Sequence, residues 1–242
     1  MELVRVKDYR EMTEKLLWYC TMQIVEKPDS VLSFTTGRTT EGLLQRLAEV
    51  IEEGLDVSKC VFLNLDEYVG RRDGAYSVYS FMHRCLYDRI TVGPAKIDMP
   101  DAEADDKEAE IRRYLGTLGK YKRDIQLLGL GTNGHIGANE PGTPFNSTMF
   151  VADSAKTTIQ ATQELFHLKL EETPVQMYTM GFTEIMEAEH IILAASGKSK
   201  AWAVKEAVEG EITEKVPASL LRKHKNFTFI ADEEAAALLR QH

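Results

Sequence analysis

Five short apolar runs recur along the chain, each bounded by turn or polar residues. They cover residues 31–34, 61–65, 125–130, 191–195 and 227–230. Runs of this length are too short for buried helices, and continuous apolar character is typical of strands that are buried on both faces. We therefore predict a strand at each run.

Longer stretches with helical periodicity separate these runs. They cover residues 40–53, 76–90, 105–118 and 200–208. Glycine lies just beyond three of them, at Gly54, Gly119 and Gly210, where a left-handed residue is expected to end a helix. Strands that alternate with helices predict right-handed βαβ crossovers. The pattern therefore predicts one α/β domain over residues 1–242, a Rossmann-like three-layer αβα sandwich with a mostly parallel sheet.

Composition narrows the class of partner. The 242 residues are 43% apolar, enough for one large core, and the net charge of -9 argues against a nucleic-acid or anionic membrane surface. The three cysteines are widely spaced and form no CxxC pair, so neither a disulfide framework nor a zinc site is indicated. The chain also shows no signal-peptide pattern and no apolar run near the roughly 20 residues of a membrane helix. We expect a cytoplasmic protein that binds a small molecule, with no nucleic-acid or membrane partner.

The segments that follow each apolar run are the candidate sites, because ligands of such sheets bind beyond the carboxyl ends of the strands. Residues 36–39 (TGRT) follow the first run and lead into a helix. Free backbone N–H groups and the positive end of a helix make this turn a candidate anion site. An ordinary N-cap by Thr39 or Thr40 is the alternative. The turn is neither GxGxxG nor a P-loop, which argues against a nucleotide.

Two carboxylates, Asp66 and Glu67, follow the second run in the segment LDEYVG. At the end of a strand, a carboxylate serves as a proton-transfer base, as a metal ligand or as a cap for the next loop. This segment alone favours the cap.

The third run leads into GLGTNGHIGANEPG, residues 129–142. Its glycines and proline predict a contorted loop that closely approaches a ligand or itself. Within this loop His135 can pair with Glu140, and a carboxylate at one ring nitrogen fixes the tautomer and raises the basicity of the other nitrogen. The arrangement is typical of a proton shuttle.

The fourth run also ends in a glycine-containing turn, SGKSK, which enters a helix. A lysine in the first turn of a helix opposes the helix dipole, which favours an anionic ligand nearby. Lys198 or Lys200 could therefore add positive charge to the anion site. A solvated surface lysine is the alternative.

In order and spacing, these segments resemble the glucosamine-6-phosphate deaminase family over nearly the whole chain. The pair LDEYVG at residues 65–70 and NGHIGANEPG at residues 133–142 is highly specific, and SFMHR at residues 80–84 also looks like a helix of the family. The resemblance implies the same sandwich and an enzyme without metal or organic cofactor. Such an enzyme converts glucosamine 6-phosphate to fructose 6-phosphate and ammonia.

The resemblance also implies a role for each matching residue. His135 would open the sugar ring, with Glu140 and Asn133 orienting and tuning it. Asp66 would move a proton between C2 and C1 through an enediol or enolamine, which suits a desolvated carboxylate with a raised pKa. The phosphate would be held by Thr36, Gly37, Arg38, Thr39 and Lys200.

The chain departs from the family pattern at the phosphate. Arg38 stands where a small residue is usual, and Glu164 stands at the family's phosphate-binding arginine. We expect Arg38 to supply the missing cation and Glu164 to pair with it or turn away, because a carboxylate beside a phosphate is repulsive. The basic residues with which some members bind an allosteric activator are replaced by Phe150 and Ala152. Activation by N-acetylglucosamine 6-phosphate is therefore not expected, and a homo-oligomer stays an open alternative.

Three other functions compete with this one. Deamination of galactosamine 6-phosphate, the epimer, would use the same groups. A 6-phosphogluconolactonase-like hydrolase would have a different sequence after its His than Asn139-Glu140-Pro141. A non-catalytic sugar-phosphate sensor would normally bring a DNA-binding segment, for which we expect no room before the first strand.

Overall fold

The computed structural model describes residues 1–154, 159, 163 and 168–240. Its strands are β1 (Glu2–Val6), β2 (Val31–Phe34), β3 (Val61–Asn64), β4 (Asp66–Tyr68), β5 (Lys96–Asp98), β6 (Ile125–Gly129), β7 (Phe150–Asp153), β8 (Gln176–Thr179), β9 (His190–Ala195) and β10 (Phe227–Asp232). Its α-helices are α1 (Tyr9–Glu26), α2 (Arg38–Glu52), α3 (Val78–Cys85), α4 (Lys107–Lys120), α6 (Phe182–Ile185) and α7 (Ala201–Glu209). Its 3-10 helices are η1 (Tyr87–Arg89), η2 (Leu170–Glu172), η3 (Lys198–Lys200) and η4 (Pro217–Lys223). None of the helices in this part of the chain has both the length and the apolar character of a membrane span.

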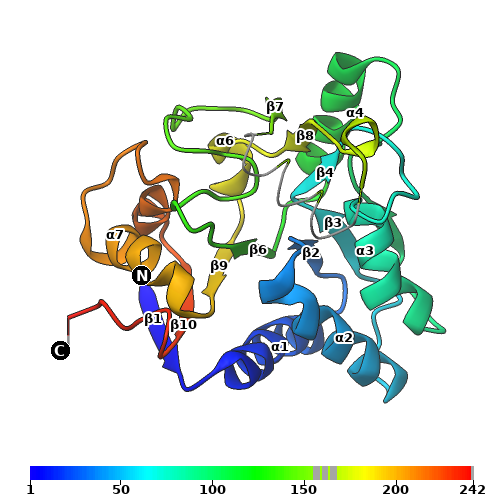
Figure 1. Ribbon diagram of the computed structural model, residues 1–242. Helices are drawn as coiled ribbons and strands as arrows, with labels where there is room; N and C mark the ends of the chain where they lie inside the picture. The colour runs from blue at the N-terminus through cyan, green and yellow to red at the C-terminus, as the bar shows by residue number, and fades with distance from the viewer. Residues whose placement is uncertain (155–158, 160–162, 164–167, 241–242) are drawn as a thin grey trace.

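Seven strands form a single sheet in the order β1-β10-β9-β6-β2-β3-β5, and every pairing in it is parallel. A smaller antiparallel sheet follows the order β4-β8-β7. Helices cover both faces of the large sheet, with α1 and α2 side by side on one of them (Figure 1). The predicted α/β sandwich with a mostly parallel sheet is confirmed.

Two apolar clusters bind the helical layers to the sheet. On one face α1, α2 and α3 contribute, for example, Leu16, Leu43 and Met82, each fully buried. On the other face α4, α6 and α7 contribute, for example, Tyr114 and Phe182. Because both faces are covered, the central strands must be apolar throughout, which explains why their runs are visible in the sequence.

The elements without an apolar run lie at the edges of the sheet or on the surface. β1 and β5 are the two edge strands, and only Val6 of β1 is fully buried. An edge strand needs no continuous apolar run, so the pattern gives no signal for either. Helix α1 exposes large apolar side chains, including Trp18 at 49% and Val25 at 62%, which blurs its periodicity.

The predicted glycine stops have different outcomes. Gly54 lies just beyond the C-cap Glu53 of α2, with the expected left-handed φ of 121°. Gly210 ends α7 as predicted, but with an extended backbone, whereas Gly119 lies inside α4, which continues to Lys120. A glycine inside a helix costs only about 1 kcal/mol, which tertiary packing readily offsets. The helix predicted over residues 76–90 is also wrong in extent, because it is divided between α3 and η1.

A crevice is expected where β2 and β6 part. Their ladder holds only two residue pairs and stops at Ser33 and Gln126. Each strand then continues with its other neighbour, β2 to Phe34 beside β3 and β6 to Gly129 beside β9. The chain order also reverses here, since the strands after β2 add on one side of it and β6 returns to the other. Ligands of open α/β sheets bind at such a switch point.

A single methyl group at Gly181 should test the packing of α6 against the preceding loop. A Cβ at this position would overlap the backbone carbonyl oxygens of Ser147 and Thr148, which cannot move aside as a side chain would. We expect Gly181→Ala to lower the free energy of unfolding by about 1–3 kcal/mol, measured by urea denaturation. Gly116→Ala in α4 is the matched control, because nothing lies within 4 Å of its Cβ. It should stabilise by up to about 1 kcal/mol, and equal destabilisation by both changes would contradict the packing.

Candidate active site

The loop after β6 brings His135, Asn133 and Glu140 into mutual contact. His135 Nδ1 lies 3.2 Å from Glu140 Oε1, a close ion-pair contact that is not aligned as a hydrogen bond. Asn133 Nδ2 donates to the other carboxylate oxygen at 2.7 Å, and Asn133 Oδ1 accepts from the His135 backbone N–H at 3.1 Å. Contact with His135 lowers the pKa of the Glu140 carboxyl, against partial burial and with help from Asn133. An ionised carboxylate therefore orients an imidazole whose side chain is 32% exposed.

Glycines let this loop fold closely on itself. A Cβ on Gly131 would lie 2.5 Å from atoms of the His135 ring, so only glycine leaves room for the imidazole. Gly131 N–H also donates to the His135 carbonyl at 2.9 Å. Gly134 turns the chain with a φ of 87°, and its carbonyl accepts from Ala218 N–H at 2.9 Å. The close self-approach predicted for the glycine-rich segment is thus observed.

Asp66 leaves the parallel sheet and begins β4. It pairs with Thr179 of β8 across an antiparallel ladder, so the two side chains share one face. Thr179 Oγ1 accepts from Ala138 N–H at 3.2 Å, which turns this face toward the loop of His135. Asp66 is 6% exposed, and its carboxylate accepts no hydrogen bond from the described residues. Burial, together with the neighbouring charge of Glu67, raises its pKa to about 7.

Glu67 has a different environment, because successive side chains of a strand point to opposite faces. Its carboxylate accepts hydrogen bonds of 2.8 Å from the backbone N–H groups of Tyr68, Val78 and Tyr79. Val78 and Tyr79 open α3, so Glu67 caps that helix. The fold thus separates the two carboxylates: Glu67 caps α3, and Asp66 lies on the face of Thr179 with no hydrogen-bond partner among the described residues.

The turn before α2 is an uncapped helix terminus. Gly37 is its N-cap, with a φ of 121°, and no side chain caps the helix. The alternative of a cap by Thr39 or Thr40 is therefore wrong: Thr40 Oγ1 donates back to the Thr35 carbonyl at 2.8 Å. The first N–H groups of α2 stay available to a ligand.

The same turn follows the strand that neighbours the chain leading to Asp66. Leu65 N–H donates to the Phe34 carbonyl at 2.9 Å, so the end of β2 is bonded to the residue directly before Asp66, and the turn begins just after that point. Arg38 is the exposed first residue of α2, and its guanidinium has no partner within the described ranges. The predicted relation of Arg38 to Glu164 lies outside those ranges and stays a prediction.

Lys200 ends η3, directly after β9. β9 pairs with β6, and Leu130 N–H donates to the Ala194 carbonyl at 3.2 Å, so this turn adjoins the start of the His135 loop. Lys200 is half-buried, and burial lowers the pKa of its ammonium group. No carboxylate in the described part of the chain pairs with it, whereas Lys198 is exposed. The fold therefore singles out Lys200 of the two candidate lysines.

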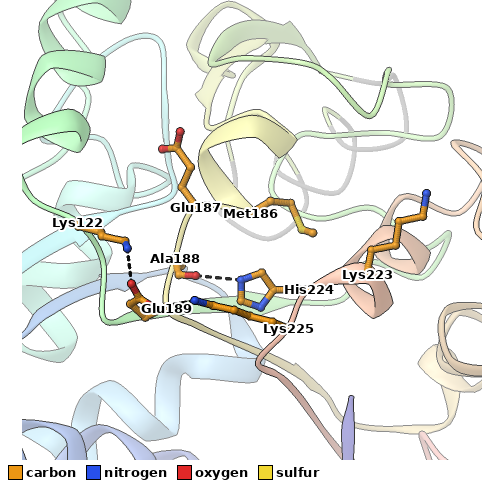
Figure 2. Close-up of a pocket in the computed structure, with 8 residues that line it drawn as sticks. All are labelled: Lys122, Met186, Glu187, Ala188, Glu189, Lys223, His224 and Lys225. Carbon is orange, nitrogen blue, oxygen red and sulfur yellow. Dashed lines mark hydrogen bonds and ion pairs between the residues drawn. The ribbon is translucent and has the colours of Figure 1, made fainter.

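Another cavity, of about 270 Å³, opens at the opposite ends of the strands (Figure 2). Lys122 and Lys225 both pair with Glu189 there, and they lower the pKa of its carboxyl to about 2. His224 Nε2 lies 2.9 Å from the Ala188 carbonyl oxygen. These contacts tie together the starts of β6, β9 and β10, and none of the predicted site residues lines this cavity.

Two residues of the site, Thr179 and Glu214, carry no signal in the sequence. Thr179 joins β8 to the His135 loop. The Glu214 backbone carbonyl accepts from Gly142 N–H at 2.8 Å, and the Glu214 carboxylate accepts from Phe145 N–H at 3.0 Å. Both lie outside the glycine-rich segments. They reach the site only through long-range packing, so no local pattern could have identified them.

Comparison with known proteins agrees with this geometry. The family model for "Glucosamine-6-phosphate isomerases/6-phosphogluconolactonase" matches residues 8–230. A glucosamine-6-phosphate deaminase of Halothermothrix orenii is 40% identical over 99% of this chain and 100% of its own. One of Shouchella clausii is 41% identical over 100% of this chain and 98% of its own.

Solved structures place the fold in the same group. A monomeric glucosamine-6-phosphate deaminase superposes with a TM-score of 0.91 at 39% identity, covering 98% of this chain and 100% of its own. The 6-phosphogluconolactonase of Trypanosoma brucei superposes at 0.78 with 20% identity, covering 99% and 98%, and shares the fold alone. Because the matches span the whole architecture and the resembling motifs, the chain belongs to the glucosamine-6-phosphate deaminase family.

Proposed function

We propose that this chain deaminates and isomerises glucosamine 6-phosphate to fructose 6-phosphate and ammonia. One observation carries the proposal: a buried carboxyl without a hydrogen-bond partner among the described residues, Asp66, shares a face with the loop that holds His135 against Glu140. Deamination with isomerisation needs one group to open the sugar ring and another to move a proton between carbons. The uncapped turn beside Asp66 adds a place for the phosphate.

Ring opening suits His135. The imidazole takes the proton of the anomeric hydroxyl and returns a proton to the ring oxygen, which requires a group that titrates near neutral pH. Glu140, ionised and held by Asn133, stabilises the imidazolium that forms in between. The product of this step is the open-chain amino aldehyde.

Proton transfer between carbons suits Asp66. Its carboxylate removes the C2 proton while the aldehyde oxygen gains a proton from the substrate's own ammonium group, which gives an enolamine, and the C2 proton is then delivered to C1. C2 is then an iminium carbon, which water hydrolyses to the ketone with release of ammonia. A carboxyl whose pKa is about 7 accepts a carbon-bound proton better than an ordinary aspartate and still ionises at neutral pH. No metal or organic cofactor enters these steps.

The phosphate is proposed to lie at the N-terminus of α2. We assign to it the backbone N–H groups of Gly37, Arg38 and Thr39 and the Thr36 hydroxyl, because an uncapped helix N-terminus attracts a phosphate. Lys200, on the turn after β9, is proposed to add a cation. Arg38 adds the second cation, in keeping with the expectation that it replaces the family's arginine. A related deaminase is monomeric, and light scattering would decide between a monomer and the homo-oligomer left open above.

Ammonia release from glucosamine 6-phosphate, followed with a coupled glutamate dehydrogenase assay, tests the proposal. We expect turnover by the wild type, and a loss of about 10²- to 10⁴-fold in Asp66→Asn and His135→Gln. The wild-type kcat/KM should fall as the pH drops through about 7, because protonated Asp66 is no longer a base.

Parallel assays separate the competitors. Faster ammonia release from galactosamine 6-phosphate would identify that epimer as the substrate. Hydrolysis of 6-phosphogluconolactone without ammonia release from either amino sugar would identify a lactonase instead. Binding of either amino sugar without turnover would favour a sensor.

Asp66→Asn should also change the pH dependence of stability. Because the pKa of Asp66 is higher in the folded than in the unfolded chain, Asp66 does not reduce the free energy of unfolding at low pH, where it is protonated in both. Once the pH passes about 7, it reduces that free energy by about 4 kcal/mol. The melting temperature of Asp66→Asn should therefore be higher than that of the wild type at pH 8 and equal to it at pH 4.

Gly131→Ala should impair catalysis through His135 alone. The added Cβ would occupy the position of the imidazole face, so we expect kcat/KM to fall by 10-fold or more, on the order of the loss from about 1 Å of misplacement. Gly129→Ala is the matched control two residues earlier, where nothing lies within 4 Å. Similar activities of the two variants would show that the imidazole is not held by Gly131.

Arg38→Gln tests the substitute cation. Loss of one phosphate contact should raise KM by about 5- to 50-fold with little change in kcat, and the effect should shrink at high salt. Arg46→Gln in the same helix is the control, because Arg46 pairs with Glu14 and Glu49 on the surface. A KM equal to that of the wild type would remove Arg38 from the phosphate site.

A further inference from the structure

Glu67 is the most completely buried carboxylate beside the site. It is 0% exposed, and its two oxygens accept three backbone hydrogen bonds, two of them from the start of α3. A carboxylate at a helix N-terminus is stabilised by the helix dipole as well as by these donors. The strand that carries Asp66 is thereby anchored to α3.

Charged and titratable side chains share a cleft with Glu67. They are Arg72, His83, Asp98, Asp101, Glu110 and Arg113. Arg113 is paired with Asp98 and Glu110, and Arg72 stacks on the Tyr79 ring at 4.0 Å. Across the ladder, Glu67 is opposite Tyr178, a neutral residue. None of the described cations forms an ion pair with Glu67, so the backbone N–H groups are its direct partners, and the Arg72 guanidinium acts on its charge only from a distance.

We propose that Glu67 is a positioning residue for Asp66, which anchors β4 through the α3 cap and places a second buried carboxyl directly behind the reacting one. This inference rests on the proposed deaminase activity. The anchor holds the Asp66 side chain toward the crevice, because a strand fixed at one residue fixes the faces of its neighbours. The charge makes a second ionisation nearby less favourable, which keeps Asp66 a strong enough base for a carbon-bound proton.

Burial is the largest influence on the Glu67 carboxyl and raises its pKa to about 7, against the three N–H donors and the Arg72 guanidinium, which lower it. Glu67 therefore carries its charge above about pH 7, in the range in which Asp66 also ionises. Arg72 is exposed, so its charge can be removed without disturbing the core. Two substitutions therefore alter the charge behind Asp66 in opposite directions.

The pH dependence of ammonia release measures that charge. In Glu67→Gln the acid limb of kcat/KM should move to lower pH by about 0.5 to 1.5 units, the Coulomb effect of one nearby charge. The plateau should fall about 2- to 10-fold because Asp66 becomes a weaker base. In Arg72→Gln the acid limb of kcat/KM should move to higher pH, by a smaller amount than it moves in Glu67→Gln. The reason is that the Arg72 charge no longer offsets the charge of Glu67.

Asp8→Asn is the matched control for the loss of a helix cap. Asp8 caps α1 by accepting from the Glu11 N–H group at 2.9 Å, and it follows β1, the edge strand on the opposite side of the sheet from β3 and β5. It should lower the melting temperature and leave the limb in place. A wild-type limb in both Glu67→Gln and Arg72→Gln, or an equal shift in Asp8→Asn, would overturn the positioning role. If Glu67→Gln does not fold, an unmoved limb in Arg72→Gln alone would do so. No ammonia release by the wild type would instead refute the proposed function.

Discussion

The pairing of Asp66 with Thr179 is the contact on which the site depends. β3 is part of the parallel sheet, and the chain leaves that sheet after Leu65 to pair with β8 in the opposite direction. Without β8, the residues after β3 would have no defined face. With it, the Asp66 side chain lies on the side where Thr179 holds the His135 loop through Ala138. A small antiparallel sheet therefore decides which carboxylate the crevice contains.

Burial raises the pKa of both carboxyls of LDEYVG to about 7, and their hydrogen bonds then distinguish them. Both are buried, yet Glu67 receives three N–H donors and Asp66 receives none from the described residues. A buried carboxyl without donors favours its neutral form, and a negative neighbour reinforces that preference. The proposed base is thus created by what surrounds Asp66 and not by the residue type.

The crevice itself follows from where the parallel sheet stops pairing. β2 and β6 separate after Ser33 and Gln126, and the turns that follow β2, β3, β6 and β9 all leave the same edge of the parallel sheet. Polar groups collect at this edge because the strand ends leave backbone donors there. At the other edge, Glu189 forms ion pairs with Lys122 and Lys225, and these ion pairs connect the starts of β6, β9 and β10 (Figure 2). One sheet therefore separates the candidate chemistry from a structural clamp.

The sequence by itself determined what is local or buried on both sides. Central strands show as apolar runs, and His135 contacts Glu140 because both belong to one short loop whose glycines allow close approach. Tertiary structure alone decided which of Asp66 and Glu67 faces the crevice, which of Lys198 and Lys200 is buried, and that Gly119 continues α4. It also supplied Thr179 and the edge strands β1 and β5. These features depend on partners distant in the chain, and a local pattern of polar and apolar residues carries no information about such partners.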